Sequence, residues 1–152
     1  MESLTKKEAL DLHKKMWNIL AEDALKGIFP DKKKAIMRMD INQLDVSCLC
    51  FCCEYAMQRV EKHTFSIDMP LSKLSSATIK CTQCPVKWGS VLTNCGWTPH
   101  CMRSDSYFYE LNEYGKLYNE SILEKDRQKI HDLCIAIAEL PERKLTPLEE
   151  VY

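Results

Sequence analysis

Nine cysteines in a chain of 152 residues are the feature that most constrains its fold. Eight of them lie between positions 48 and 101. The first ten residues are charged and lack the apolar core of a signal peptide, so we expect a protein of the cytosol. Thiols stay reduced there, and a cysteine cluster more often binds metal than forms disulfides. The odd cysteine number also fits a closed disulfide framework poorly.

Two C-x-x-C pairs predict a metal site. One pair is Cys50 and Cys53, and the other is Cys81 and Cys84, with 27 residues between the pairs (54–80). Each such turn lets two thiolates face one ion, and two turns complete the tetrahedral four-sulfur shell of structural zinc. The usual gap is about 15–20 residues, so a hairpin or short helix must fill the longer one. Free, buried thiols are the alternative.

The remaining cysteines of this region leave a second site open. Its candidate ligands are Cys48, Cys95, Cys101 and His100. Cys52 and Cys53 are adjacent and cannot easily face one ion, so one of them packs in the fold or serves another metal. An iron–sulfur cluster, which also takes four thiolates, is a further alternative to zinc.

The cysteine motifs do not match those of zinc enzymes. A zinc deaminase carries H-x-E followed by P-C-x-x-C, whereas Lys80 precedes Cys81 and Thr64-Phe65 follow His63. Two paired C-x-x-C turns also tend to close the open coordination position that a catalytic zinc needs. We therefore expect a structural zinc, no catalytic residues and no enzymatic activity.

Helical periodicity dominates both ends of the chain. Thr5 and Glu8 have the spacing of a capping box, and apolar residues behind them predict a helix over 6–26 that stops at Gly27. His13 lies on the apolar stripe of this helix and is expected to be a buried, hydrogen-bonded core residue. A second capping box, Ser121 to Glu124, predicts a helix over 122–140 that ends at Pro141.

Weaker signals fill the middle of the chain. We expect a short helix near 53–62, a polar loop or helix face over 30–47, and an aromatic helical stripe over 107–118. Cys134 and His131 are expected as a packed thiol and a surface residue. These patterns predict a mainly α-helical fold. Amphipathic terminal helices would pack around a zinc knuckle in a single domain (1–144), followed by a flexible tail (145–152).

The charge pattern offers weak evidence about partners. The chain holds 21 Lys and Arg against 22 Asp and Glu, a balance that disfavours a protein built mainly to coat nucleic acid. A basic segment is either a solvated face or an anion-binding patch. The candidate partner-binding residues are Lys32, Lys33, Lys34, Arg38, Trp97, Tyr107 and Tyr109.

The cysteine motif resembles a group of small proteins of phages and prophages of Firmicutes. Their pattern is C-F-x-C-E-Y-A followed by C-x-x-C-P-L-x-W. This chain has CFCCEYA at 50–56 and CTQCPVKW at 81–88, with Val86 in place of the usual leucine. The resemblance implies zinc-ligand roles for Cys50, Cys53, Cys81 and Cys84. It also implies that Trp88 packs over the site, and that the protein works in a bacterial host cytosol.

Small phage proteins without catalytic motifs commonly block something of the host, and by that analogy we expect a binding protein that antagonises a host factor. The target would be an antiviral defence protein or its nucleotide signal. A nucleotide would require basic and aromatic residues to converge on one pocket. A protein target would require an exposed apolar patch. The alternative is a zinc-dependent nucleic-acid-binding regulator.

Overall fold

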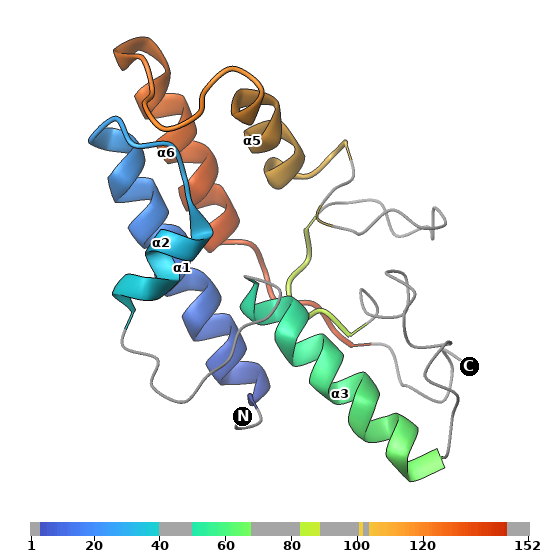
Figure 1. Cartoon of the computed structure of the whole chain (residues 1–152). Helices are drawn as coiled ribbons and strands as arrows, with labels where there is room; N and C mark the ends of the chain where they lie inside the picture. The colour runs from blue at the N-terminus through green and yellow to red at the C-terminus, as the bar shows by residue number, and fades with distance from the viewer. Residues whose placement is uncertain (1–3, 40–49, 68–82, 89–100, 102–103, 146–152) are drawn as a thin grey trace.

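A computed structural model describes residues 4–39, 50–67, 83–88, 101 and 104–145, and this part of the chain is mainly helical (Figure 1). The sequence-based prediction of a mainly α fold is thereby confirmed. Among these residues, no helix combines the length and the apolar character required to cross a membrane. The helices are α1 (Lys6–Leu25), α2 (Lys32–Arg38), α3 (Phe51–Ile67), α5 (Tyr107–Gly115) and α6 (Glu124–Ala138).

Helix α1 begins and ends where its sequence signals indicate. The Glu8 amide donates to Thr5 Oγ1, and the Thr5 amide donates back to Glu8 Oε1, both at 3.1 Å, so the predicted capping box is formed. After the helix, Gly27 takes a φ of 87°, a left-handed conformation that glycine adopts at little cost. The predicted helix over 6–26 is thus confirmed to within one residue.

The centre of the fold is the antiparallel pair of α1 and α6, which lie side by side in Figure 1. Each helix has an apolar stripe, and the two stripes face one core because burying them removes apolar surface from water. The buried residues of this pair include Ala9, Met16, Leu20 and Ala24 on α1 and Ile130, Leu133 and Ile137 on α6.

The start of α6 differs from the prediction. Leu123 occupies the N-cap and makes no side-chain capping bond, so the capping box expected at Ser121 and Glu124 is wrong. Ser121 instead pairs with Ile28 in an isolated antiparallel bridge. The Ile122 amide donates to the Gly27 carbonyl at 2.8 Å, and this bond keeps the chain extended until Leu123.

Helices α2 and α5 cover the central pair. Asp31 caps α2 by accepting from the Lys34 amide at 3.2 Å, so part of the polar segment 30–47 is helical. Ser106 caps α5 by accepting from the Tyr109 amide. Of the aromatic stripe over 107–118, Leu111 is buried while Tyr107 is exposed, so the stripe contributes only partly to the core.

Helix α3 is longer than the expected 53–62, and the segment 83–88 lies against the chain that follows α6. Val86 pairs with Glu142 in a second isolated bridge. The Lys87 amide donates to the Pro141 carbonyl at 2.9 Å, and the Arg143 amide donates to the Pro85 carbonyl at 2.7 Å. The chain that follows the last helix therefore holds residues 83–88, which include Cys84 of the second motif, in place. Of the expected tail, residues 146–152 lie outside the described part.

Candidate metal centre

Three cysteines lie at the start of α3. Cys50 precedes the helix, and its carbonyl accepts the first α3 bond, from the Glu54 amide at 3.0 Å. Cys52 and Cys53 follow in the first turn, and buried Phe51 anchors that turn in the core. The positive end of a helix dipole favours thiolates, so the start of α3 is a position where a nearby thiol can be deprotonated more easily.

Cys84 comes from the segment 83–88 and is buried. Two arginines hold this segment. Arg143 Nε donates to the Cys84 carbonyl at 3.1 Å, and Arg59 Nε donates to Gln83 Oε1 at 2.7 Å. Arg59 belongs to α3. The Arg59 bond therefore ties this segment to the helix that carries the other cysteines, and the Arg143 bond ties Cys84 to the chain that follows α6.

The structure gathers Cys50, Cys52, Cys53 and Cys84 into one group through pairwise thiol contacts, and we call these four residues the thiol cluster. The Cys50 sulfur accepts from the Cys52 and Cys53 thiols, and Cys52 also hydrogen-bonds to Cys84. Cys101 is half-buried against the same core, and its charge acts on Cys53.

These contacts divide the cluster into two kinds of sulfur. The hydrogen bonds from Cys52 and then Cys53 hold the pKa of Cys50 well below its usual value, and the bond with Cys52 lowers the pKa of Cys84. The same bonds, together with burial, raise the pKa values of Cys52 and Cys53. Cys50 and Cys84, one from each motif, are therefore the sulfurs that deprotonate first.

A cluster of soft sulfur donors suits a soft or borderline metal ion such as zinc. Three or more His, Cys, Asp and Glu side chains arranged as a metal site do not occur within the described ranges. The predicted ligands Cys50, Cys53 and Cys84 are near one another, whereas Cys81 lies outside these ranges. The second predicted site lies largely outside them as well, because of its four candidates only Cys101 is described.

His13 is a residue to which sequence reasoning assigned only a structural role. It is buried, and its Nε2 lies 2.9 Å from the Ile137 carbonyl, so the prediction of a buried, hydrogen-bonded histidine is confirmed. Burial lowers the pKa of the ring. Its Nδ1 is buried and has no hydrogen-bond partner in the described part of the molecule. No spacing in the sequence links position 13 to the cysteine motifs.

Aromatic side chains pack beside this region. The edge of Trp88 meets the His13 ring at 5.6 Å between centroids, and Trp88 also hydrogen-bonds the Cys84 sulfur. Phe108 contacts both Trp88 and Trp17, at centroid distances of 5.9 and 5.8 Å. These ring contacts bury Trp88 and Trp17 beside the cluster, in which Cys52 and Cys84 are buried and Cys50 and Cys53 are half-buried.

The basic candidates do not form one patch. Lys32 Nζ lies 4.1 Å from the Phe108 ring centroid and 5.6 Å from that of Trp17, and its charge acts on Cys50. Arg38 forms an ion pair with Asp23 of α1. Lys33 and Lys34 are exposed. The basic segment therefore offers two exposed lysines to a partner.

Of the aromatic partner candidates, Tyr107 and Tyr109 are exposed on α5, and Trp97 lies outside the described residues.

At one end of the molecule α1 finishes close to where α6 begins (Figure 1). A pocket and several exposed apolar side chains lie at this end. The pocket has a volume of about 430 Å³ and is lined by Ile28, Phe29, Pro30, Asp31, Lys34, Asn119, Glu120 and Ser121. Its charged lining is one lysine against two carboxylates. Four large apolar side chains are 44–73% exposed on these turns, and we call them the apolar end: Leu25, Ile28, Leu117 and Leu123.

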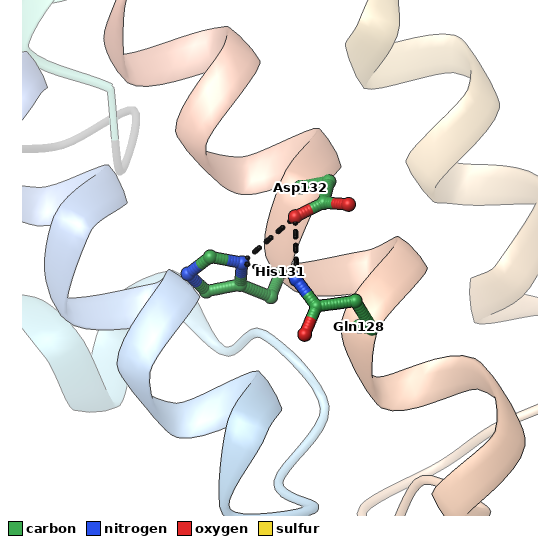
Figure 2. A network of polar contacts seen from close by, with 3 residues as sticks. All are labelled: Gln128, His131 and Asp132. Carbon is green, nitrogen blue, oxygen red and sulfur yellow. Dashed lines mark hydrogen bonds and ion pairs between the residues drawn. The ribbon is translucent and has the colours of Figure 1, made fainter.

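Figure 2 shows a second polar group, on α6. Gln128 Nε2 donates to Asp132 Oδ1 at 2.8 Å, and His131 Nδ1 lies 3.0 Å from the same oxygen. The hydrogen bond from His131, and then that from Gln128, lower the pKa of Asp132. Gln128 precedes His131 by three positions and Asp132 by four on the same helix, so this network stabilises α6 locally. His131 is half-buried with polar partners on its own helix, whereas His13 is buried.

Comparisons with protein-family models, with curated proteins and with solved structures found no match to this chain.

Proposed function

We propose that this chain is a zinc-stabilised binding protein of the phage type that its cysteine motif resembles, and that it antagonises a host factor. In this proposal the zinc is structural, and the binding surface is the apolar end. The two parts lie at different ends of the α1–α6 pair, so the metal and the partner act on separate surfaces.

The surroundings of the thiol cluster support a structural metal. Cys52 and Cys84 are buried within the same core as Phe51 and Trp88. The cluster joins α3 to the segment 83–88, two parts of the chain that are distant in sequence. A metal bound there would cross-link them, and its binding free energy would become folding free energy.

The apolar end is the single observation that carries the binding function. Soluble proteins commonly expose single apolar side chains, but several large ones at one end of the molecule mark a site for a partner. Of the four, Ile28 also lines the pocket. The Ile28–Ser121 bridge joins the turn that carries Leu25 and Ile28 to the loop between α5 and α6, which carries Leu117 and Leu123. The four side chains therefore come from two neighbouring turns.

The charges of the pocket favour a protein target over a nucleotide signal. A nucleotide carries phosphates, which need cationic or amide donors. Asp31 and Glu120 outnumber Lys34 in the pocket lining, so the pocket repels anions more than it attracts them. The engagement of Lys32 and Arg38 within the fold also weakens the case for a nucleic-acid regulator. We therefore propose an antiviral defence protein of the host as the partner.

Two measurements test the proposal. Native mass spectrometry of the purified full chain should find one zinc per chain. Tagged protein in host cells that carry an antiviral defence should restore infection and recover the defence protein, and Leu117→Glu with Leu123→Glu should abolish both effects. The matched control, Lys33→Gln, should retain both, because Lys33 is exposed and does not line the pocket. Recovery of nucleic acid or a nucleotide that depends on the lysines instead would overturn the choice of partner.

A further inference from the structure

We propose that the partner segment which covers the apolar end carries an arginine, and that this arginine enters the pocket lined by Asp31 and Glu120. The inference rests on the proposed binding function and adds the chemistry of the bound segment. It starts from the pocket that Ile28 shares with the apolar end.

Three stretches of chain build the pocket. Residues 28–31 follow α1, Lys34 lies on α2, and residues 119–121 precede α6. The Phe29 amide donates to the Glu120 carbonyl at 2.9 Å, so a backbone hydrogen bond joins the first stretch to the third. The pocket is therefore formed before a partner arrives, which lowers the entropic cost of binding.

The charges of the lining are unbalanced. Within the described part of the chain, Asp31, Glu120 and Lys34 form no ion pair. The lining therefore carries two carboxylates against one ammonium group, a net charge of −1. Asp31 Oδ1 already accepts from the Lys34 amide at 3.2 Å, so this amide is not available to an anion. A cationic group complements this pocket, because it lowers the electrostatic energy of the unpaired carboxylates.

The remaining lining favours a cation on a long apolar stem. Ile28, Phe29 and Pro30 supply apolar surface, and a pocket of about 430 Å³ has room for an extended side chain. Lysine and arginine both bury their methylene stems on such surface and keep the charged head at polar groups. Arginine fits better, because its planar guanidinium has five donors for carboxylates from different stretches and also stacks on aromatic rings.

The pocket adjoins the apolar end through Ile28, whose side chain is 44% exposed. The Ile28–Ser121 bridge joins this residue to the loop that carries Leu117 and Leu123. A segment with its arginine in the pocket therefore brings neighbouring apolar side chains to the apolar end. The apolar contacts would supply most of the affinity, and the arginine would fix the register of the segment.

Short peptides test the inference on the full chain labelled with nitrogen-15. Each peptide has blocked ends and places one central residue, arginine, glutamine or glutamate, between leucines. We expect the arginine peptide to shift the amide resonances of Ile28, Glu120 and Leu123. It should bind at least about 3-fold more tightly than the glutamine peptide, and the glutamate peptide should bind most weakly. Equal affinities for the arginine and glutamate peptides would overturn the inference.

Charge variants of the pocket should have effects of opposite sign on the arginine peptide. Asp31→Asn with Glu120→Gln leaves Lys34 as the one charge of the lining, and asparagine can still cap α2. This double variant should weaken binding by about 10-fold, whereas Lys34→Gln should strengthen it by about 3-fold. The matched control is Glu124→Gln, which removes an exposed carboxylate outside the lining and should change nothing. Weaker binding by Lys34→Gln would contradict the inference, also where the double variant does not fold.

Further outcomes separate this inference from the proposed function. A dimer of the free chain in sedimentation that Leu117→Glu dissociates would place a second copy on the apolar end and overturn the inference. If the arginine peptide shows no preference while the chain still restores infection through the apolar end, the inference fails and the proposed function stands. If the preference is found in a chain that does not restore infection, the host target is refuted and the arginine site is upheld.

Discussion

The α1–α6 pair and the thiol cluster differ in what they bury. The helix pair buries aliphatic side chains such as Leu20, Ile130 and Ile137, for which volume matters more than the identity of any atom. The residues next to the thiol cluster include buried polar side chains, those of Gln83 and Glu54. Each polar group needs a particular partner, because an unpaired buried polar atom is costly.

The partners at the cluster are specific. Arg59 Nε donates to Gln83 Oε1 at 2.7 Å, and Gln58 Nε2 donates to Glu54 Oε1 at 3.3 Å. In the helix pair, the loss of stability on substitution is therefore expected to grow with the volume that is removed. At the thiol cluster, removal of a single atom is expected to destabilise the fold strongly. The following predictions test this difference, from the largest expected effect to the smallest.

Cys84→Ser is expected to have the largest effect. Serine removes one sulfur of the cluster, and loss of the metal removes folding free energy outright, which in small metal-folded peptides amounts to about 10–16 kcal/mol. Thermal unfolding followed by circular dichroism should show a large drop in Tm or aggregation. Chelation of the wild type should reproduce the drop. A variant with the wild-type melting curve would refute the structural role of the metal.

Leu20→Ala tests the helix pair. Leu20 is fully buried, and truncation of such a leucine costs about 2–5 kcal/mol because it leaves a cavity. Denaturant unfolding of zinc-loaded protein should give this loss with unchanged zinc stoichiometry. Release of zinc from the folded variant would show that the two regions are not energetically separate.

Gly27→Ala tests the turn at the apolar end. An added Cβ would lie 2.7 Å from the Arg127 guanidinium, and the φ of 87° disfavours any side chain. We expect a loss of about 1–2 kcal/mol by chemical denaturation. The control is Gly115→Ala, where the new Cβ would lie 3.6 Å from the Phe29 ring and φ is not positive. Similar losses for both variants would argue against strain at Gly27.

The smallest expected effect is a loss of stability at alkaline pH, caused by the buried Cys134 thiol. Burial raises the pKa of this thiol to about 12, from an ordinary value of 9.0. Between these values the folded state holds a proton that the unfolded state has lost, so stability decreases as pH rises above about 9. At pH 9, mass spectrometry should find Cys134 unmodified by iodoacetamide in the folded protein. Rapid labelling of folded protein would contradict the burial of this thiol.

The starts of α1 and α6 were not equally predictable from the sequence. The start of α1 depends on Thr5 and Glu8, neighbours whose reciprocal bonds form within one turn. The same local pattern at Ser121 and Glu124 failed, because a bond between Ile122 and Gly27 overrides it from 95 positions away (122 minus 27). Local signals therefore held only where no tertiary contact competed with them.

The candidate site was predictable in part. The C-x-x-C spacing selected Cys50, Cys53 and Cys84 as candidates, and the structure places these three near one another. The place of Cys52 between Cys50 and Cys84 was not predicted, because a helical first turn brings adjacent residues to different neighbours. Lys32 was a candidate for either a solvated face or an anion-binding patch, and it lies against the Phe108 ring.

By itself, the sequence determined the mainly helical class, the limits of α1 and the buried histidine, because periodicity and capping act over a few residues. Only the tertiary structure decided which atoms meet. It placed Trp88 in contact with both His13 and Cys84, left His13 Nδ1 without a hydrogen-bond partner among the described residues, and gathered the apolar end from two turns. These contacts join residues far apart in the chain, and their positions depend on how the helices pack.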